Sequence, residues 1–154
     1  MYSKDKTDKF WMQHAIALAE QAKDDNEVPV GAIVVLAGEI IGKARNNTIK
    51  NSDPSGHAEI NALRSAAKLV MNHRLIGATL FVTLEPCAMC YGAIVQSRIS
   101  RLVFGAYDHK TGVCGSSSNL HEQACFNHTP NIKGGVLEED CSLILKNFFK
   151  ERRN

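Results

Sequence analysis

Residues 78–96 read ATLFVTLEPCAMCYGAIVQ, and this stretch decides which fold the chain can adopt. Its first part, residues 78–84, is an apolar run that is typical of a buried strand. Pro86 then stands where helices commonly open, and Ile94 and Val95 continue an apolar pattern at helical spacing. The stretch therefore predicts a buried strand followed directly by a helix.

Similar patterns continue on both sides of this stretch. Val30 begins a β-branched run, the turn Ala37-Gly38-Glu39 follows, and a second extended run predicts an antiparallel hairpin. After the hairpin, strands alternate with helices, which predicts an α/β fold: a mixed sheet with helices on both faces, in one domain over residues 1–154. The predicted strands are residues 30–36, 40–45, 78–84, 101–105 and 132–137. The predicted helices are one capped by Thr7, one after the polar loop 46–56, one at Pro86, and a last one over residues 138–153.

Length and composition fit a domain that needs no disulfides. A chain of 154 residues buries about 70% of the surface that its unfolded form exposes. The cysteines number five, which is odd, and the first ten residues are charged where a signal peptide would be apolar. We therefore expect a reducing, cytoplasmic setting. No apolar run approaches the ~20 residues that would span a bilayer, so we expect no membrane partner.

The net charge of +2 is too small to indicate a polyanionic partner by itself, but its distribution is uneven. Residues 146–154 hold four cations, one acid and two adjacent aromatic rings. Rings that stack on bases and cations that contact phosphates suit single-stranded RNA. Phe148 falls on the apolar side of the predicted helix and is favoured as a core residue. The predicted RNA contacts are Phe149, Arg152 and Arg153.

Two segments carry the chemistry, His57-Ala58-Glu59 and Pro86-Cys87-Ala88-Met89-Cys90, and each begins a predicted helix. Cys87 and Cys90 are three residues apart, so a helix projects both side chains from one face, about 5–6 Å apart. Zinc accepts thiolate and neutral imidazole, and His57 supplies a third ligand. Three protein ligands leave one tetrahedral position open for water, which is typical of a catalytic zinc site.

Glu59 is the predicted proton carrier of this site. Zinc-bound water loses a proton near pH ~7, and a carboxylate could accept that proton and pass it to a departing amine. However, Glu59 lies two residues after His57, which is about 200° around a regular helix. The two side chains can therefore share a site only if the helix entry is irregular or if they converge from the first turn.

The cysteine pair also has less specific interpretations. A Cys-x-x-Cys segment alone fits a redox pair or two core residues. For the combined motifs, the leading alternative is a structural zinc whose fourth ligand comes from elsewhere in the chain. The candidates are Cys114, Cys125, Cys141 and the other five histidines, none of which lies in a comparable motif.

His-x-Glu followed by Pro-Cys-x-x-Cys resembles the signature of the zinc-dependent nucleobase deaminases, of which the tRNA enzymes are an established example. The resemblance to bacterial tRNA adenosine deaminases is longer than this signature and spans nearly the whole chain. It is carried by EVPVGA at 27–32, DP at 53–54, HAEI at 57–60, VTLEPC at 82–87, SRI at 97–99, VFGA at 103–106, KTG at 110–112 and FF at 148–149.

This resemblance implies a three-layer α/β/α fold of the cytidine-deaminase type, with a five-stranded mixed sheet, in a homodimer whose active site borders the interface. It implies hydrolysis of adenosine to inosine at the wobble position of a tRNA anticodon, with release of ammonia and with one zinc ion per subunit. The implied roles are zinc binding by His57, Cys87 and Cys90, proton transfer by Glu59, and contacts to a flipped base from Asn46 and the backbone amide of Ala58.

Two of the expected substrate contacts have structural alternatives. Asp108, in the loop after the fourth predicted strand, could accept a hydrogen bond from a ribose 2′-hydroxyl, which DNA lacks. A solvated loop acid is the alternative. Asn46 is followed by Asn47, and such a pair after a strand is also a common turn.

Departures from the family pattern are local: Tyr91 replaces a small residue, Gly56 replaces the usual alanine, and residues 113–129 are distinct. Two other functions share the zinc motifs. A deaminase of free cytosine, guanine or a nucleotide would close its pocket over a small molecule, and the basic C-terminal helix argues against it. A non-catalytic zinc module that binds RNA has no reason to place Glu59 beside an open zinc position.

Overall fold

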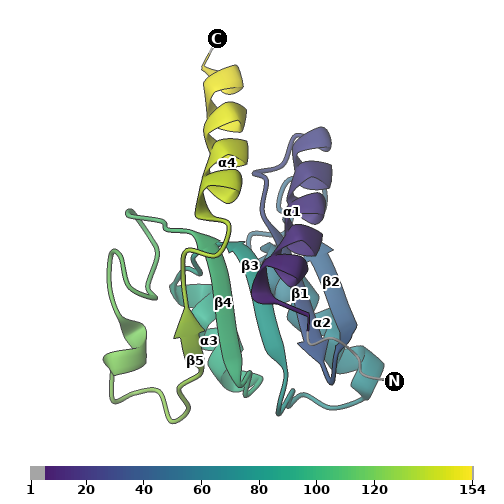
Figure 1. Ribbon diagram of the computed structural model, residues 1–154, viewed down its shortest axis with the longest axis vertical. Coiled ribbons are helices and arrows are strands. Elements are labelled where there is room, and N and C mark those ends of the chain that lie inside the picture. Colours follow the sequence, from purple (N-terminus) through teal and green to yellow (C-terminus); the bar gives the residue numbers. More distant parts are fainter. Residues whose placement is uncertain (1–5, 154) are drawn as a thin grey trace.

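The computed structural model describes residues 6–153, so the ends of the predicted domain, residues 1–5 and 154, lie outside the described part (Figure 1). The elements are α1 (Asp8–Asp24), β1 (Gly31–Leu36), β2 (Glu39–Arg45), α2 (Ala58–Val70), β3 (Thr79–Leu84), α3 (Ala88–Gln96), β4 (Arg101–Ala106), the 3-10 helix η1 (Leu120–Glu122), β5 (Asn131–Lys133) and α4 (Glu138–Arg152).

The five strands form one mixed sheet, as predicted, and the structure places them in the order β2-β1-β3-β4-β5. β1 is antiparallel to both β2 and β3, whereas β3, β4 and β5 are parallel. The first two strands are joined by a two-residue turn in which Ala37 and Gly38 have φ of 51° and 77°. Positive φ at both positions matches the right-handed twist of a hairpin.

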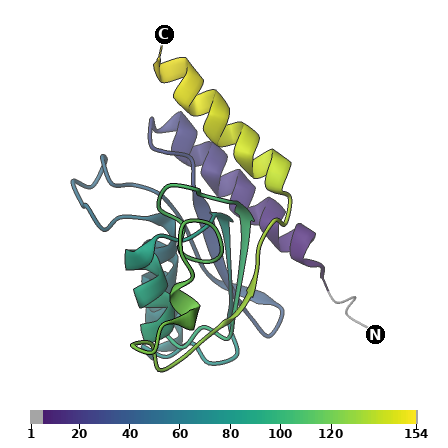
Figure 2. The ribbon, with the colours of Figure 1, turned by 90° about the vertical axis from the view of Figure 1, so that its left-hand side faces the viewer.

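Helices cover both faces of the sheet, which confirms the three-layer prediction. Figure 2 shows α1 and α4 side by side on one face, with α3 on the other, where it contacts α2. Because successive side chains of a strand point to opposite faces, β3 contributes to two cores. Leu80 and Val82 pack with α2 and α3, and Phe81 packs with Trp11 of α1.

Glycines in two strands let helices approach the sheet closely. A Cβ at Gly31 would lie 2.7 Å from the backbone nitrogen of Ala19 in α1, and one at Gly42 would lie 2.5 Å from the carbonyl oxygen of Ala62 in α2. Neither strand could carry a side chain there without moving the helix. The contact at Gly42 helps to fix α2, whose N-terminus carries part of the site.

The fifth strand is shorter than predicted. The expectation was 132–137, but β5 ends at Lys133. Gly134 and Gly135 follow, and Gly135 has φ of 82°, so the chain leaves the sheet there. Val136 belongs instead to the core between the sheet and α1 and α4. Within residues 6–153, no helix is both long enough and apolar enough to cross a membrane.

Candidate metal centre and active site

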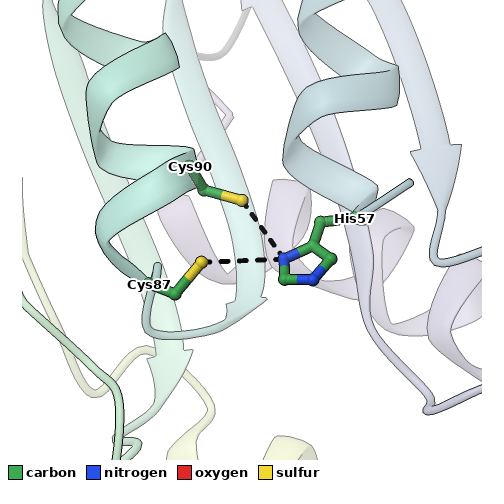
Figure 3. Close-up of side chains that lie close together, drawn as sticks. All are labelled: His57, Cys87 and Cys90. Atoms are coloured by element: carbon green, nitrogen blue, oxygen red, sulfur yellow. Dashed lines mark hydrogen bonds between the residues drawn. The ribbon is translucent and has the colours of Figure 1, made fainter. Parts of the chain in front are cut away.

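His57, Cys87 and Cys90 converge just beyond the C-terminal end of β3. Nδ1 of His57 lies 3.7 Å from Sγ of Cys87 and 3.4 Å from Sγ of Cys90. Figure 3 shows both sulfurs pointing at the same ring nitrogen. The three ligand atoms lie within 4.8 Å of one another, and no fourth residue of the described chain joins the group. The group could hold a metal ion and leave one position open.

Two of these residues are helix N-caps, which explains how the group forms. His57 caps α2 with φ −72° and ψ 152°, and Cys87 caps α3 with φ −81° and ψ 175°. An N-cap residue has an extended backbone, so the direction of its side chain is not set by the roughly 100° per residue of the helix that begins after it. Cys90 is the third residue of α3, the position that an N-cap side chain faces. The irregular entry that the sequence required of α2 is therefore present.

Glu59 shares the cavity with His57 and Cys87. Its side chain belongs to the first turn of α2, and the residue is only 4% exposed. Burial raises the pKa of Glu59, and the nearby His57 opposes that shift. A carboxyl group whose pKa is raised can both accept and release a proton closer to neutral pH, as acid and base catalysis requires.

The two thiols differ in their affinity for a proton. A hydrogen bond with the Cys90 side chain lowers the pKa of Cys87 to about 4, and a hydrogen bond with His57 acts in the same direction. The same thiol pair, together with burial, raises the pKa of Cys90. Unpaired N–H groups at the N-termini of α2 and α3 favour negative charge at this point.

The remaining cysteines are not placed to complete the group. Burial raises the pKa of Cys114 to about 12 and that of Cys141 also to about 12, so both are neutral thiols at physiological pH. Cys125 is exposed. Among the described residues, neither a cysteine nor a histidine supplies the fourth ligand that a structural zinc would need.

A cavity of about 220 Å³ adjoins the group of His57, Cys87 and Cys90, here called the metal group. Its wall combines apolar side chains, including Val28, Val30 and Leu84, with polar ones, including Asn46 and Asp108. Pockets for larger ligands usually exceed about 300 Å³, so this volume suits a single ring system. Of the predicted site residues, the cavity brings together Asn46, His57, Ala58, Glu59, Cys87 and Asp108.

The side-chain amide of Asn46 is oriented by the backbone. Its Nδ2 donates to the carbonyl oxygen of Val28 at 3.2 Å, and its own N–H donates to the carbonyl oxygen of Val30 at 3.0 Å. Its Oδ1 is buried without a hydrogen-bond partner in the described chain. Buried acceptors are rarely left unpaired, so this oxygen is available to a donor on a ligand.

Asp108 lies on the cavity wall and also shapes its own loop. Oδ1 accepts the N–H groups of Lys110 and Thr111, both at 3.1 Å, and Oδ2 accepts the hydroxyl of Thr111 at 2.8 Å. The carboxylate oxygens keep lone pairs for a further donor. Contact with a ribose hydroxyl stays a prediction.

The predicted contacts in the last helix separate into two groups. Phe149 and Arg153 line a second cavity, of about 490 Å³, which shares Val28, Leu84 and Asp108 with the first. The two cavities therefore adjoin, and these two residues lie near the site.

Arg152 points elsewhere. It donates to the carbonyl oxygen of Asn26, and its guanidinium lies 4.3 Å from the ring centroid of Phe148. Phe148 itself is 4% exposed, in line with its expected core position. The contacts of Arg152 therefore dock α4 onto the end of α1.

Sequence reasoning did not single out two buried acids beside the cavity. Glu27 is 1% exposed and Glu85 is 2% exposed. Each accepts hydrogen bonds from a loop that lines the cavity. Their positions in the sequence could have indicated them. Glu85 directly follows a buried strand, and Glu27 lies shortly before one.

Comparison with known proteins agrees with this geometry. Residues 6–153 match the protein family described as MafB19-like deaminase. The chain is 51% identical over 147 residues to the tRNA-specific adenosine deaminase of Haemophilus influenzae, which covers 95% of this chain and 85% of that protein. The chain belongs to the tRNA-specific adenosine deaminase family.

Two further comparisons extend this result for the deaminase. The tRNA-specific adenosine deaminase of Bacillus subtilis is 45% identical over 146 residues, covering 95% of this chain and 91% of that protein. A solved structure from a study of A-to-I editing by tRNA:A34 deaminases at the wobble position is 40% identical, with a TM-score of 0.85 over 87% of this chain and 97% of that one. The resemblance and the cytidine-deaminase-like fold are therefore confirmed.

Tyr91, where the resemblance led us to expect a small residue, is accommodated inside this deaminase. Its side chain is fully buried, and its ring meets that of Phe126 edge-on with centroids 5.1 Å apart. Phe126 belongs to the distinct segment 113–129. The two departures from the family pattern therefore pack against each other.

Gly56, where the resemblance led us to expect alanine, is explained by a neighbouring amide. A Cβ at this position would lie 2.7 Å from Oδ1 of Asn47. That oxygen accepts a 2.8 Å hydrogen bond from Nδ2 of Asn61 in α2. The backbone N–H of Asn47 also donates to the carbonyl oxygen of Gly56 at 3.0 Å. Asn47 therefore holds the loop before His57 together by hydrogen bonds, and its side chain occupies the space that a side chain at position 56 would need.

We predict that Gly56→Ala alone lowers the free energy of unfolding by about 1–3 kcal/mol, because the new methyl group displaces Asn47. Adding Asn47→Ala removes the colliding oxygen, so the double variant should be more stable than the sum of the single losses implies. Urea unfolding of the four proteins measures this coupling. Additive losses would contradict the explanation.

Proposed function

We propose that this deaminase hydrolyses adenosine to inosine at the wobble position of a tRNA anticodon. The observation that carries the proposal is the placement of Glu59 beside the His57, Cys87 and Cys90 group, on the wall of a cavity whose volume suits one fused ring system. The names of the Haemophilus influenzae and Bacillus subtilis relatives and the solved tRNA:A34 deaminase support the identity of the substrate.

We further propose that the metal is zinc, one ion per chain. Zinc bonds of about 2.3 Å to sulfur and about 2.0–2.1 Å to nitrogen, at tetrahedral angles, separate these atoms by about 3.6 Å. The two S···N distances in the structure, 3.7 and 3.4 Å, lie on either side of that value. Two thiolates and one neutral imidazole are a donor set that zinc favours.

Proton transfer falls to Glu59 in this proposal. A bound zinc ion would supply a water molecule that is deprotonated near pH ~7. Glu59 accepts one proton of the attacking water and delivers it to the amino nitrogen of adenine, which leaves as ammonia. The other water proton ends on the adjacent ring nitrogen, and the ring carbon keeps the oxygen as a carbonyl group. Net, one water is consumed and one ammonia is released. Glu59 is only 4% exposed, which limits the access of bulk water to its carboxyl group.

The cavity wall provides contacts for a flipped base. The unpartnered Oδ1 of Asn46 would accept a ring or exocyclic N–H of the base. The N–H of Ala58, at the first position of α2, has no acceptor within its helix and would donate to the opposite edge. These two contacts would hold the base flat against the metal group.

The second cavity favours a polymeric substrate over a free base. It continues from the first, and it is lined by Phe149 of α4 and by Arg153, the C-cap of that helix. We propose that Phe149 stacks on a neighbouring base and that Arg153 contacts a phosphate, as single-stranded RNA recognition requires. Arg152, whose partners are Asn26 and Phe148, is proposed to stabilise the helix rather than to bind RNA.

The family resemblance also supports a homodimer in the cytoplasm. None of the five cysteines, all in the described chain, forms a disulfide, which is compatible with a reducing compartment. The mass of the purified protein in solution tests the dimer directly.

Zinc content provides the first test. We predict that Cys90→Ser abolishes stoichiometric zinc, because a serine hydroxyl does not ionise at neutral pH as a thiol can. Cys125→Ser is the matched control, since Cys125 is exposed and lies outside the group. Elemental analysis of the purified proteins measures the ratio of zinc to protein. Full zinc in Cys90→Ser would rule out the proposed ligand set.

Activity on defined substrates provides the second test. We predict inosine formation from an anticodon stem-loop and no ammonia release from free adenine, cytosine or guanine. Glu59→Ala should retain zinc and lose about 100- to 10,000-fold in kcat, the usual contribution of acid and base catalysis. The same assay on Asn46→Ala tests the base contact. Faster release of ammonia from a free base than from the stem-loop would favour the small-molecule function. Undiminished turnover of Glu59→Ala would exclude Glu59 as the proton carrier.

Two adjacent arginines make a matched pair for the third test. We predict that Arg153→Gln weakens stem-loop binding and reduces the slope of log affinity against log salt by about 0.7, which corresponds to one phosphate contact. Arg152→Gln should leave this slope unchanged and lower the melting temperature. Binding titrations over a salt series, with thermal unfolding of both variants, measure the difference. Equal slopes for both variants and the wild type would contradict the assignment of Arg153.

A further inference from the structure

Glu85 is almost completely buried, and its carboxylate accepts four hydrogen bonds from one loop. Oε1 accepts the N–H of Asp108 at 3.0 Å and the hydroxyl of Ser116 at 2.5 Å. Oε2 accepts the N–H groups of Cys114 at 2.9 Å and Ser116 at 3.2 Å. All four donors belong to residues 108–116, here called the Asp108 loop.

The Asp108 loop lies directly on this carboxylate. A Cβ at Gly112 would come within 2.6 Å of Oε1 of Glu85 and 2.5 Å of the carbonyl oxygen of Asp108. The hydroxyl of Ser116 also lies 2.7 Å from that carbonyl oxygen. The loop therefore wraps around the carboxylate closely enough that one of its positions has no room for a side chain.

The same loop is tied to the segment that carries a metal ligand. The N–H of Val113 donates to the carbonyl oxygen of Pro86 at 3.0 Å, one residue before Cys87. The N–H of Glu85 donates to the carbonyl oxygen of Ala106 at 2.8 Å, at the end of β4. Glu85 thus stands between the metal group and the loop that forms another part of the cavity wall.

A buried carboxylate accepts hydrogen bonds but cannot donate them, and losing them costs the full desolvation of a charge. Charge-assisted hydrogen bonds are also stronger than neutral ones. Four such bonds to one loop therefore favour a single loop conformation. In that conformation Asp108 and Thr111 face the cavity.

We propose that Glu85 is a positioning residue for substrate binding, which holds the Asp108 loop in the conformation that contacts RNA. The inference rests on the proposed function, because it assigns the loop a contact with the same RNA. It predicts that Glu85 contributes to KM and not to the chemical step, which belongs to Glu59 and the metal group.

Glu27 offers a matched comparison on the other loop. It is equally buried, and its carboxylate accepts the N–H groups of Ile49 at 3.0 Å and Lys50 at 2.9 Å. This loop carries Thr48, which lines the cavity at a different point. A general loss of stability would affect both glutamate variants alike, whereas a positioning role for the Asp108 loop belongs to Glu85 alone.

The test uses the zinc-loaded enzyme and an anticodon stem-loop. In Glu85→Gln, an NH₂ group faces backbone N–H donors, so the loop must shift. We expect KM to rise about tenfold, with kcat within about threefold of wild type and zinc content unchanged. Ser116→Ala removes only one hydroxyl and should raise KM in the same direction, so it carries the test if Glu85→Gln does not fold.

A double-mutant cycle with Asp108→Asn identifies the route of the effect. Asp108→Asn should raise KM in wild type and in Glu27→Gln, but should add little in Glu85→Gln, where the loop has already moved. Unchanged KM in both Glu85→Gln and Ser116→Ala, additive losses in the Glu85 cycle, or a silent Asp108→Asn would each overturn the inference. A wild-type enzyme inactive on the stem-loop would instead refute the proposed function.

Discussion

The site depends on the meeting of two helix N-termini just beyond the C-terminal end of β3, the central strand of the sheet. β3 runs through Glu85 and Pro86 directly into α3, while the close approach of α2 to β2 at Gly42 brings His57 to the same place. Both ends present N–H groups without intrahelical acceptors, and their N-cap residues turn sideways to the helix. Two thiols and an imidazole therefore share a point where negative charge is favoured.

A second constraint is the cost of burying charge. Glu27, Glu59 and Glu85 are all at most 4% exposed, but they meet this cost differently. The first and last are satisfied by N–H donors from loops, which these carboxylates hold in place. For Glu59, burial raises the pKa. Three glutamate side chains thus differ in behaviour, two of them anchoring loops and the third, Glu59, being the proposed proton carrier, because their surroundings differ.

The sequence was sufficient for the layers, the hairpin and the His-Cys-Cys group that the structure brings together, because periodic apolar runs and a short motif encode them locally. It overestimated β5, since the glycines at 134 and 135 end the pairing that the apolar residues after them seemed to continue. It grouped Arg152 with Arg153 as predicted RNA contacts. The structure distinguishes them, because Arg152 contacts Asn26 and Phe148, which the spacing of the two arginines could not show. It also overlooked Glu85, whose donors lie more than twenty residues away along the chain.

Residue types and spacing by themselves indicated the fold class and which histidine, cysteines and acid to expect at the site, and the longer motifs carried the resemblance to the family. Only the tertiary structure decided that His57 and Cys87 are N-caps, that Oδ1 of Asn46 is left without a donor, and that Gly56 makes room for Asn47. The physical reason is that spacing along one element fixes which side chains share a face. Distances between elements depend instead on how closely their backbones pack.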